Sequence, residues 1–178
     1  MRHTSAMPEV IAHAMSDDDY AAFGALIAEY WAWLQVRYAE RPGFVDAVGG
    51  HQAIDAELVS LSTVYGPPAG TVLLARRDGV VVGGIALRDL GDGVCEMKRL
   101  FVPDRFQGNG TGRRLCQALI EEATAAGFQA MRLDTGVRND EALAMYAGLG
   151  FRECPPYHDY PADLMAHLRF LELPLAVA

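Results

Sequence analysis

A glycine-rich segment between an expected strand and an expected helix constrains the fold of this chain more than any other feature. Residues 107–112 read Gln-Gly-Asn-Gly-Thr-Gly, follow the strand-like run VCEMKRLFV and precede a segment with helical spacing. Glycine loses more conformational freedom on folding than other residues, so three glycines at alternate positions need a reason. A tight turn needs one glycine, whereas a loop whose backbone approaches a ligand can use all three.

The start of a helix is suited to binding an anion. Its first N–H groups have no partner within the helix, and the aligned peptide dipoles place partial positive charge there. We therefore expect the N–H groups of this loop to converge on a phosphate or pyrophosphate, unobstructed by side chains. Arg105, Arg113 and Arg114 flank the loop, and we expect them to add positive charge.

Two other phosphate-binding loops fit the segment less well. A P-loop requires lysine directly after its last glycine, whereas Lys98 precedes the glycines here. A dinucleotide fingerprint has the spacing GxGxxG directly after a parallel strand, with an acidic residue about 20 positions later. Asp134 satisfies the acidic position, but the spacing here is GxGxG and residues 103–106 intervene. A dinucleotide-dependent oxidoreductase therefore stays as an alternative with the weaker fit.

The chain as a whole, residues 1–178, reads as one α/β domain. Asp78-Gly79 and Gly91-Asp92-Gly93 are turn signals between β-rich runs, and they predict an antiparallel meander of three strands. The expected strands cover 9–15, 71–77, 80–90, 94–102, 129–135, 150–154 and 168–173, and the expected helices cover 18–37, 51–61, 112–126 and 139–150. This order predicts a single mixed, mostly antiparallel sheet flanked by helices, with a partly parallel centre where helices cross over.

Charge and composition exclude several classes of partner. The formal net charge is −8, and affinity for a phosphate backbone depends on clustered Lys and Arg, so we expect no nucleic acid partner. No run approaches the ~20 apolar residues that cross a bilayer, and the N-terminus lacks the apolar stretch of a signal peptide, so we expect no membrane. The three cysteines and five histidines show no metal-ligand spacing. We therefore expect free thiols, no metal and a reducing, cytoplasmic compartment.

The spacing Gln107-x-x-Gly110-x-Gly112 resembles the Gln/Arg-x-x-Gly-x-Gly/Ala signature of the GNAT superfamily, the acetyl-CoA-dependent N-acetyltransferases. It stands where that family has it, between the fourth strand and the following helix. LDT at 133–135 and AMYAGLGFRE at 144–153 resemble the later strand, the tyrosine-bearing helix and the Gly-Phe turn of the family. The resemblance covers residues 70–173 well and the N-terminal third in outline. It implies the GNAT acyl-CoA N-acyltransferase fold.

The resemblance also implies acetyl-CoA as the cosubstrate and indicates its contacts. Its pyrophosphate would lie on the loop residues Gln107, Gly108, Asn109, Gly110, Thr111, Gly112 and Arg113. In the family the strand before the loop splays from its neighbour, which would expose the backbone of Leu100, Phe101 and Val102 to pantetheine and the acetyl carbonyl. Asn139 matches a helix-opening asparagine that contacts pantetheine in relatives, although an N-cap role explains it equally well.

Two residues match catalytic positions of the family. Glu96 lies on the strand before the loop, where a number of members carry a general-base glutamate, and we expect partial burial to raise its pKa toward a useful value. An ion pair with Lys98 and contact with a substrate ammonium are the other roles open to it. Tyr146 matches a tyrosine near the coenzyme A sulfur, where a protonated phenol would donate to the departing thiolate. A core aromatic is the alternative for Tyr146.

These residues together predict an N-acetyltransferase. It would transfer the acetyl group of acetyl-CoA to a primary amine of a small molecule or peptide, by direct attack in a ternary complex. The alternative on the same fold is a non-catalytic acyl-CoA sensor or interaction module. The loop Tyr-His-Asp-Tyr at 157–160 is either a determinant of acceptor specificity or a solvated connection. Dimers are common among members of the family, so a homodimer is one assembly that the resemblance implies.

Overall fold

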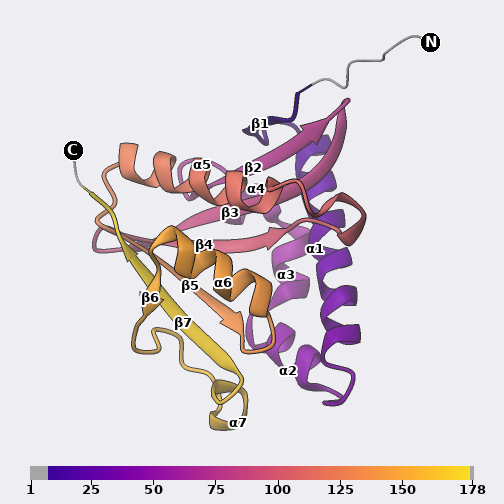
Figure 1. The fold of residues 1–178 in the computed structure, drawn as a ribbon, viewed down its shortest axis with the longest axis vertical. Helices are drawn as coiled ribbons and strands as arrows, with labels where there is room; N and C mark the ends of the chain where they lie inside the picture. The colour runs from indigo at the N-terminus through magenta and orange to yellow at the C-terminus, as the bar shows by residue number, and fades with distance from the viewer. Residues whose placement is uncertain (1–7, 177–178) are drawn as a thin grey trace.

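A seven-stranded sheet with the order β1-β2-β3-β4-β5-β7-β6 forms the centre of the computed structural model, which describes residues 8–176 (Figure 1). The strands are β1 (Val10–His13), β2 (Gly70–Arg77), β3 (Val80–Gly91), β4 (Val94–Phe101), β5 (Ala130–Gly136), β6 (Arg152–Glu153) and β7 (Leu168–Pro174). Every neighbouring pair is antiparallel except β4 and β5, which are parallel. The predicted mixed, mostly antiparallel sheet with a partly parallel centre is confirmed.

Helices cover both faces of this sheet (Figure 1). They are α1 (Asp17–Arg37), α2 (Phe44–His51), α3 (Ile54–Val59), α4 (Leu61–Tyr65), α5 (Thr111–Ala125), α6 (Asp140–Leu149) and α7 (Ala162–Met165), with a 3-10 turn η1 (Asp104–Phe106). α5 and α6 pack into one apolar core with β2, β3 and β4, while α1 and α4 form a second core on the opposite face. None of the described helices combines the length and apolar character needed to cross a membrane.

α1 begins at a capping box and packs closely on β3. The Ser16 side chain accepts a hydrogen bond from the Asp19 N–H, and the Asp19 carboxylate accepts one from the Ser16 N–H, so two N-terminal N–H groups are satisfied. Where α1 crosses the sheet, a Cβ on Gly84 would lie 2.9 Å from Phe23 and 3.0 Å from Leu26. The absence of a side chain at position 84 therefore permits the close approach of the helix to the strand.

The predicted helix at 51–61 is wrong. The structure has three short helices in this region, α2, α3 and α4, and α2 begins at Phe44, before the expected start. Ala53 separates α2 from α3 with a φ of +52°, a conformation that residues with a Cβ rarely adopt. The expected helix at 51–61 is therefore interrupted at Ala53 by a backbone break that no glycine or proline at that position indicates. The short helix α7, within the expected loop at 155–167, was also not predicted.

β4 separates from β5 part of the way along its length. The two strands pair only between 94–96 on β4 and 130–132 on β5, although β4 continues to Phe101 and β5 to Gly136. Arg99 has a φ of +57° and the register between β3 and β4 shifts beside it, which marks a β-bulge. Beyond the bulge β4 has no strand on its β5 side, so the expected splay of the strand before the glycine loop is confirmed.

The close contact between α1 and β3 gives a testable expectation about stability. We expect Gly84→Val to lower the free energy of unfolding by about 1–3 kcal/mol, because the new side chain must displace Phe23 and Leu26 from a packed core. Urea denaturation would measure the change. Gly50→Ala is the control, because a Cβ at Gly50 meets no atom within 4 Å and should leave stability unchanged or slightly higher. Equal stability of Gly84→Val and wild type would contradict this account of the packing.

Candidate active site

A cavity of about 560 Å³, here called the loop cavity, lies between the glycine loop, the end of β4, α1 and α6. All the predicted cofactor residues except Asn109 line it, together with the predicted catalytic residue Tyr146. They are Leu100, Phe101, Val102, Gln107, Gly108, Gly110, Thr111, Gly112, Arg113, Asn139 and Tyr146. The fold therefore brings segments 100–102, 107–113 and 139–146 together around one space.

The N-terminus of α5 opens into the loop cavity. Gly108 and Gly110 have φ values of +84° and +74°, which only glycine adopts without strain, and Gly110 is the residue that precedes the first turn. The N–H groups of Thr111, Gly112 and Arg113 have no intrahelical acceptor, and no side chain of residues 8–176 caps the helix in its place. A Cβ on Gly112 would lie 3.8 Å from Val102 and 3.9 Å from Met145, on the wall of the same cavity.

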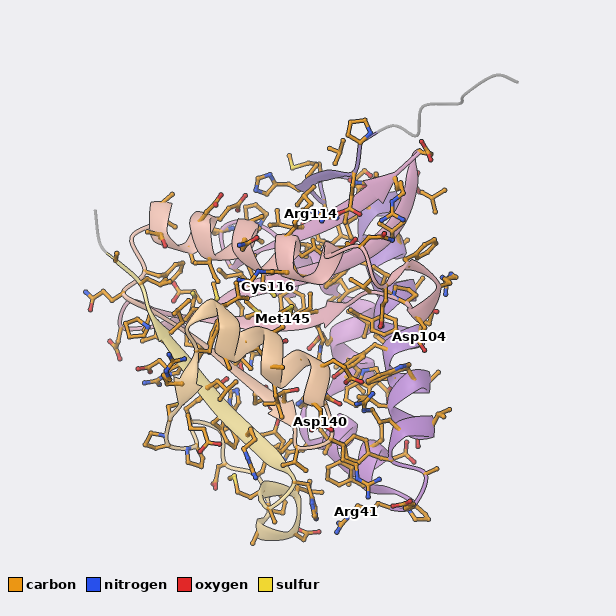
Figure 2. All side chains as sticks on the ribbon, viewed as in Figure 1. Arg41, Asp104, Arg114, Cys116, Asp140 and Met145 are labelled. Atoms are coloured by element: carbon orange, nitrogen blue, oxygen red, sulfur yellow. The ribbon has the colours of Figure 1, made fainter. Side chains whose placement is uncertain are left out.

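Side chains of the loop brace its shape. The Gln107 side-chain amide donates to the Val102 carbonyl at 2.8 Å and to the Asp104 carboxylate at 3.0 Å. Arg114, in the first turn of α5 (Figure 2), donates to the Asn109 carbonyl at 2.7 Å. These bonds hold the backbone of the loop in one conformation, so its free N–H groups are arranged before a ligand binds.

Only one of the three flanking arginines keeps its charge available to the loop cavity. Arg105 is paired with Glu29, and Arg114 is paired with Glu9 at 2.6 Å, so the expectation that both add positive charge is wrong. Arg113 lines the cavity, and its single hydrogen bond within residues 8–176 goes to the Gly148 carbonyl at 3.4 Å. Carboxylates from distant segments hold the other two guanidinium groups away from the cavity lining, and Glu9 also pairs with Arg77 at 2.9 Å.

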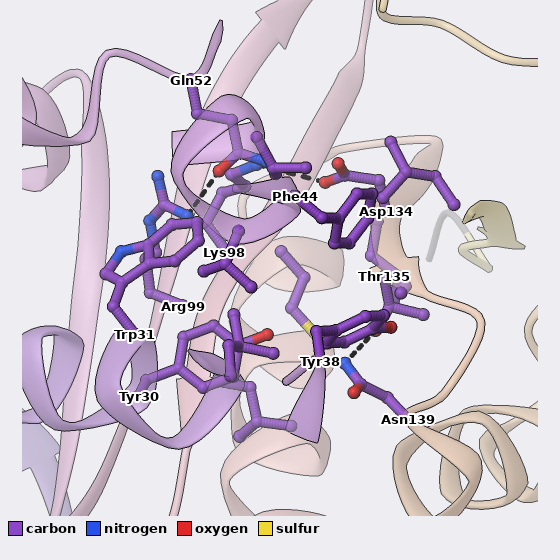
Figure 3. A pocket seen from close by; sticks show the side chains of 18 of the residues that line it. Tyr30, Trp31, Tyr38, Phe44, Gln52, Lys98, Arg99, Asp134, Thr135 and Asn139 are labelled. Carbon is purple, nitrogen blue, oxygen red and sulfur yellow. Dashed lines mark hydrogen bonds and ion pairs between the residues drawn. The ribbon is translucent and has the colours of Figure 1, made fainter. Parts of the chain in front are cut away.

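A second, smaller cavity of about 80 Å³, here called the central cavity, lies in the gap between β4 and β5 (Figure 3). It shares Tyr30, Leu100, Thr135, Asn139 and Tyr146 with the loop cavity. Tyr146 is buried, and burial raises its pKa well above the ordinary value of a phenol, so the hydroxyl stays protonated.

Asn139 lies where the central and loop cavities meet, and one of its side-chain atoms lacks a hydrogen-bond partner among the described residues. Its side-chain nitrogen donates to the Thr135 hydroxyl at 3.1 Å (Figure 3), whereas its buried Oδ1 has no partner among the described residues. The side chain makes no capping hydrogen bond to α6, so an N-cap role does not explain it. A buried acceptor without a partner is costly, which favours a ligand that donates to it.

A third cavity, of about 380 Å³ and here called the polar cavity, lies on the other side of the gap. It shares Gln52, Lys98 and Arg99 with the central cavity. Its lining consists of His51, Gln52, Glu57, Arg88, Lys98, Arg99, His158, Asp159 and Tyr160. The predicted specificity loop at 157–160 therefore contributes to a cavity wall and is not merely a solvated connection.

Glu96 is fully buried beside the polar cavity, and the expected rise in its pKa is wrong. Its carboxylate accepts hydrogen bonds from Arg88 at 2.6 Å, His158 at 2.7 Å and Tyr157 at 3.0 Å, and Lys98 lies 3.7 Å away. Burial alone would raise the pKa, but the hydrogen bond from His158 and the charges of Lys98 and Arg88 lower it to about 2. The carboxylate is therefore ionised at every ordinary pH and is a weak proton acceptor.

Asp134 lies in the same charged network. It accepts hydrogen bonds from Lys98 at 3.2 Å and from Tyr160 at 2.9 Å. Burial would raise its pKa, but the charge of Lys98 contributes to lowering it. Asp134 lines the central cavity and not the loop cavity, so it is not placed to bind a ribose as the dinucleotide alternative requires.

Glu96, Asp134 and His158 also have ligand atoms within 4.8 Å of one another, a spacing that a metal ion could occupy. The ammonium of Lys98 already lies within ion-pair distance of both carboxylates. A cation from the protein itself therefore supplies the compensating charge at this position.

Arg88 and Arg99 were missed by the sequence analysis, and His158 was placed only within the expected specificity loop, without its contact to Glu96. Arg99 donates to both oxygens of Glu57, at 2.7 and 2.8 Å, and to the Gln52 side chain at 2.6 Å. Arg88 and His158 both bind Glu96. The alternation of Glu96 and Lys98 on one strand indicated a polar face, but their partners lie 8 to 62 residues away in the chain and carry no local signal.

Comparison with known proteins gives consistent matches. The model of the Acetyltransferase (GNAT) family matches residues 33–151. An IAA acetyltransferase of Azospirillum brasilense is 39% identical over 119 residues, which are 66% of this chain and 76% of that protein. An uncharacterized N-acetyltransferase of Schizosaccharomyces pombe is 34% identical over 120 residues, 66% of this chain and 74% of its own.

Solved structures match the fold over almost the whole chain. The PaiA N-acetyltransferase of Thermoplasma acidophilum in complex with coenzyme A has a TM-score of 0.71 at 18% identity, covering 94% of this chain and 99% of that one. An acetyltransferase of Streptococcus agalactiae has a TM-score of 0.72 at 20% identity, covering 94% and 98%. At these identities the likeness concerns the fold.

The low pKa of Glu96 predicts how stability depends on pH. A glutamate that titrates near 2 when folded and near ~4.3 when unfolded stabilises the protein above about pH 4.3, and this contribution is lost as the pH falls toward 2. Between pH 5 and 2 we expect wild type to lose about 3 kcal/mol more stability than Glu96→Gln. Urea denaturation at a series of pH values measures this difference. Glu153→Gln, at an exposed position, is the control and should follow wild type. Parallel curves for wild type and Glu96→Gln would refute the depressed pKa.

Proposed function

The chain belongs to the GNAT family of acetyltransferases, and from this premise we propose that it transfers the acetyl group of acetyl-CoA to a primary amine of a small molecule or peptide. The observation that supports this proposal most strongly is the arrangement of the three cavities along the gap between β4 and β5. The loop cavity and the polar cavity lie at opposite ends, and both share lining residues with the central cavity. Two substrates that enter from opposite sides would meet beside Tyr146 and Asn139.

The loop cavity supports the binding of coenzyme A. The N–H groups of the first turn of α5 and the guanidinium of Arg113 suit the pyrophosphate, because both favour negative charge. Pantetheine would follow the side of the chain that β5 leaves open at Leu100, Phe101 and Val102, and the Oδ1 of Asn139 would accept a hydrogen bond from one of its amides. These contacts carry the thioester toward the central cavity.

Tyr146 is the proposed proton donor to the leaving group. The amine nitrogen attacks the thioester carbonyl carbon, a C–N bond forms, and the C–S bond breaks to release coenzyme A as a thiolate. A buried and protonated phenol can donate to that sulfur as its charge develops. The position of Tyr146, shared by the central and loop cavities, supports this role.

We propose that His158, held by Glu96, takes the proton from the amine. A carboxylate with a pKa of about 2 is too weak a base for an ammonium group, so Glu96 is better suited to orienting and charge compensation. The His158 ring nitrogen lies 2.7 Å from Glu96, and the side chain is 26% exposed, so a proton taken from the substrate can pass to solvent. Imidazole is the side chain that most often serves as a general base.

Direct attack is favoured over a covalent acyl-enzyme. Cys95 and Cys116 are buried, and burial raises the pKa of each thiol to about 12. The thiolate is the nucleophilic form of cysteine, so neither residue is reactive near neutral pH. A ternary complex of enzyme, acetyl-CoA and amine therefore fits the site better than a two-step transfer.

Replacement of Gly110 tests the cofactor site. We expect Gly110→Val to weaken the binding of coenzyme A about tenfold or more, because valine cannot hold the left-handed backbone that directs the loop N–H groups. Isothermal titration calorimetry with coenzyme A measures the affinity. Gly127→Val is the matched control, because Gly127 has a φ of +86° at the other end of α5 and lies outside the loop cavity. Unchanged affinity in a folded Gly110→Val protein would remove the loop from the cofactor site.

Replacement of Tyr146 tests the enzymatic step. We expect Tyr146→Phe to lower kcat about 10²-fold while the KM for acetyl-CoA changes little, because the lost hydroxyl acts on the leaving sulfur and not on binding. The release of free thiol in the presence of an amine panel measures turnover. Tyr65→Phe is the control, since the Tyr65 hydroxyl is buried on the opposite face of the sheet without a partner among the described residues. Binding of acetyl-CoA without thiol release from any amine would favour the sensor alternative.

A further inference from the structure

The carboxylates around the polar cavity already have partners. Both oxygens of Glu57 accept hydrogen bonds from Arg99, and Glu57 is only 8% exposed. Both oxygens of Glu96 are likewise occupied, one by Arg88 and the other by Tyr157 and His158. Every oxygen of these two carboxylates therefore already accepts a hydrogen bond from within the protein.

Asp134 follows the same pattern. One of its oxygens accepts from Lys98 and the other from Tyr160, and its side chain is 5% exposed. The remaining carboxylate of the lining, Asp159, is exposed, where solvent and salt screen its charge. The buried carboxylates in and beside the polar cavity are therefore each paired with a cation of the protein.

Arg88 and Lys98, which line the polar cavity, have N–H groups that make no hydrogen bond to the described residues. A guanidinium carries five N–H groups, and Arg88 uses only its Nε–H among residues 8–176, in the bond to Glu96. Its Nη1 and Nη2 groups are left for a ligand, on a side chain that is 33% exposed. Lys98 has three N–H donors, with one hydrogen-bonded to Asp134 and a longer contact at 3.7 Å to Glu96. The polar cavity thus presents donors and few acceptors.

We propose that the acceptor substrate is an amine that also carries a carboxylate, and that Arg88 binds this carboxylate in the polar cavity. The inference rests on the proposed function, since it names the class of amine that the same site acetylates. The carboxylate would accept two hydrogen bonds from the free Nη groups of Arg88 and a further one from Lys98. The amine would then point through the side of the cavity shared with the central cavity, past Gln52 and toward Tyr146.

The buried charges of the network balance one another, which suits an acceptor that carries no net charge of its own. Arg88, Lys98 and Arg99 are balanced by Glu57, Glu96 and Asp134, so the network is neutral before a ligand binds. A planar carboxylate fits the fork of one guanidinium in a bidentate geometry. An amine that carries one carboxylate has no net charge when its ammonium is protonated, whereas a phosphate adds negative charge and a polyamine adds positive charge that this neutral network does not balance.

The acetylation of matched amines by wild-type protein tests this inference. The probes are α-amino acids, the corresponding amino-acid amides, spermidine and phosphoethanolamine, each with acetyl-CoA and a thiol-release readout. The amides keep the reacting amine and the side chain but lack the carboxylate. We expect kcat/KM to be about 10–100-fold higher for at least one amino acid than for its amide, because charge-assisted hydrogen bonds are lost.

Three results would overturn the inference while leaving acetyl transfer intact. They are a preference for spermidine, a preference for phosphoethanolamine, and equal rates for the acids and their amides. Thiol release with none of the probes, nor with any member of a broad amine library, would instead count against the proposed function. The two failures are therefore distinguishable.

Two arginine variants test whether Arg88 binds the carboxylate of the substrate. Arg88→Lys keeps a positive charge beside Glu96 but loses the fork, so we expect the KM for the carboxylate-bearing amine to rise about tenfold and the KM for its amide to stay within about twofold. Arg76→Lys is the matched control, because Arg76 is a strand arginine paired with Asp19 at 2.5 Å outside the polar cavity. An Arg88→Lys protein with the acid-to-amide preference of wild type would overturn Arg88 as the anchor.

Discussion

The separation of β4 from β5 at the bulge of Arg99 is the constraint on which the rest of the site depends. The positive φ of Arg99 is unfavourable for a residue with a side chain, and such strain persists only where surrounding contacts enforce it. Here the guanidinium is held by Glu57 of α3 and by Gln52, which follows α2. The short helices that interrupt the expected helix at 51–61 are therefore the elements that fix the bulge and keep the central cavity open.

The charged network of Arg88, Glu96, Lys98 and Asp134 beside the bulge holds its side chains in fixed positions but adds little to the net free energy of unfolding. Taking charges out of water costs several kcal/mol per ion, and the attraction between partners recovers this only when their geometry is good. Glu96 satisfies that condition, because it has three hydrogen-bond donors and a nearby lysine. Breaking one such pair is costly, so each side chain has one preferred position. The spare donors of Arg88 and Lys98 are consequently directed at the cavity and not toward alternative partners.

The sequence was sufficient for features that local residues determine. The glycine loop, the hairpin turns at 78–79 and 91–93, and the placement of Tyr146 and Asn139 follow from spacing and turn chemistry, and the structure brings these residues to one cavity. Prediction from the sequence fails where the interacting residues are far apart in the chain. The pKa of Glu96 moves down and not up because His158 and Arg88 bind it, and Arg114 is held by Glu9, which also pairs with Arg77. Such pairings are properties of the folded chain alone.

In the proposed site the two substrates are recognised by different parts of the polypeptide, and this difference explains what a family comparison can reveal. The proposed cofactor contacts are mainly backbone N–H groups and glycines, so they leave a compact signature at 107–112 that a family shares. The polar cavity is built from side chains on α3, β3, β4 and the loop before α7, together with residues next to α2. Each of these can change without disturbing the loop. Membership of the family therefore indicates the cosubstrate that donates the acetyl group. The substrate that accepts the acetyl group has to be inferred from the hydrogen-bonding groups that this chain leaves without a partner in the polar cavity.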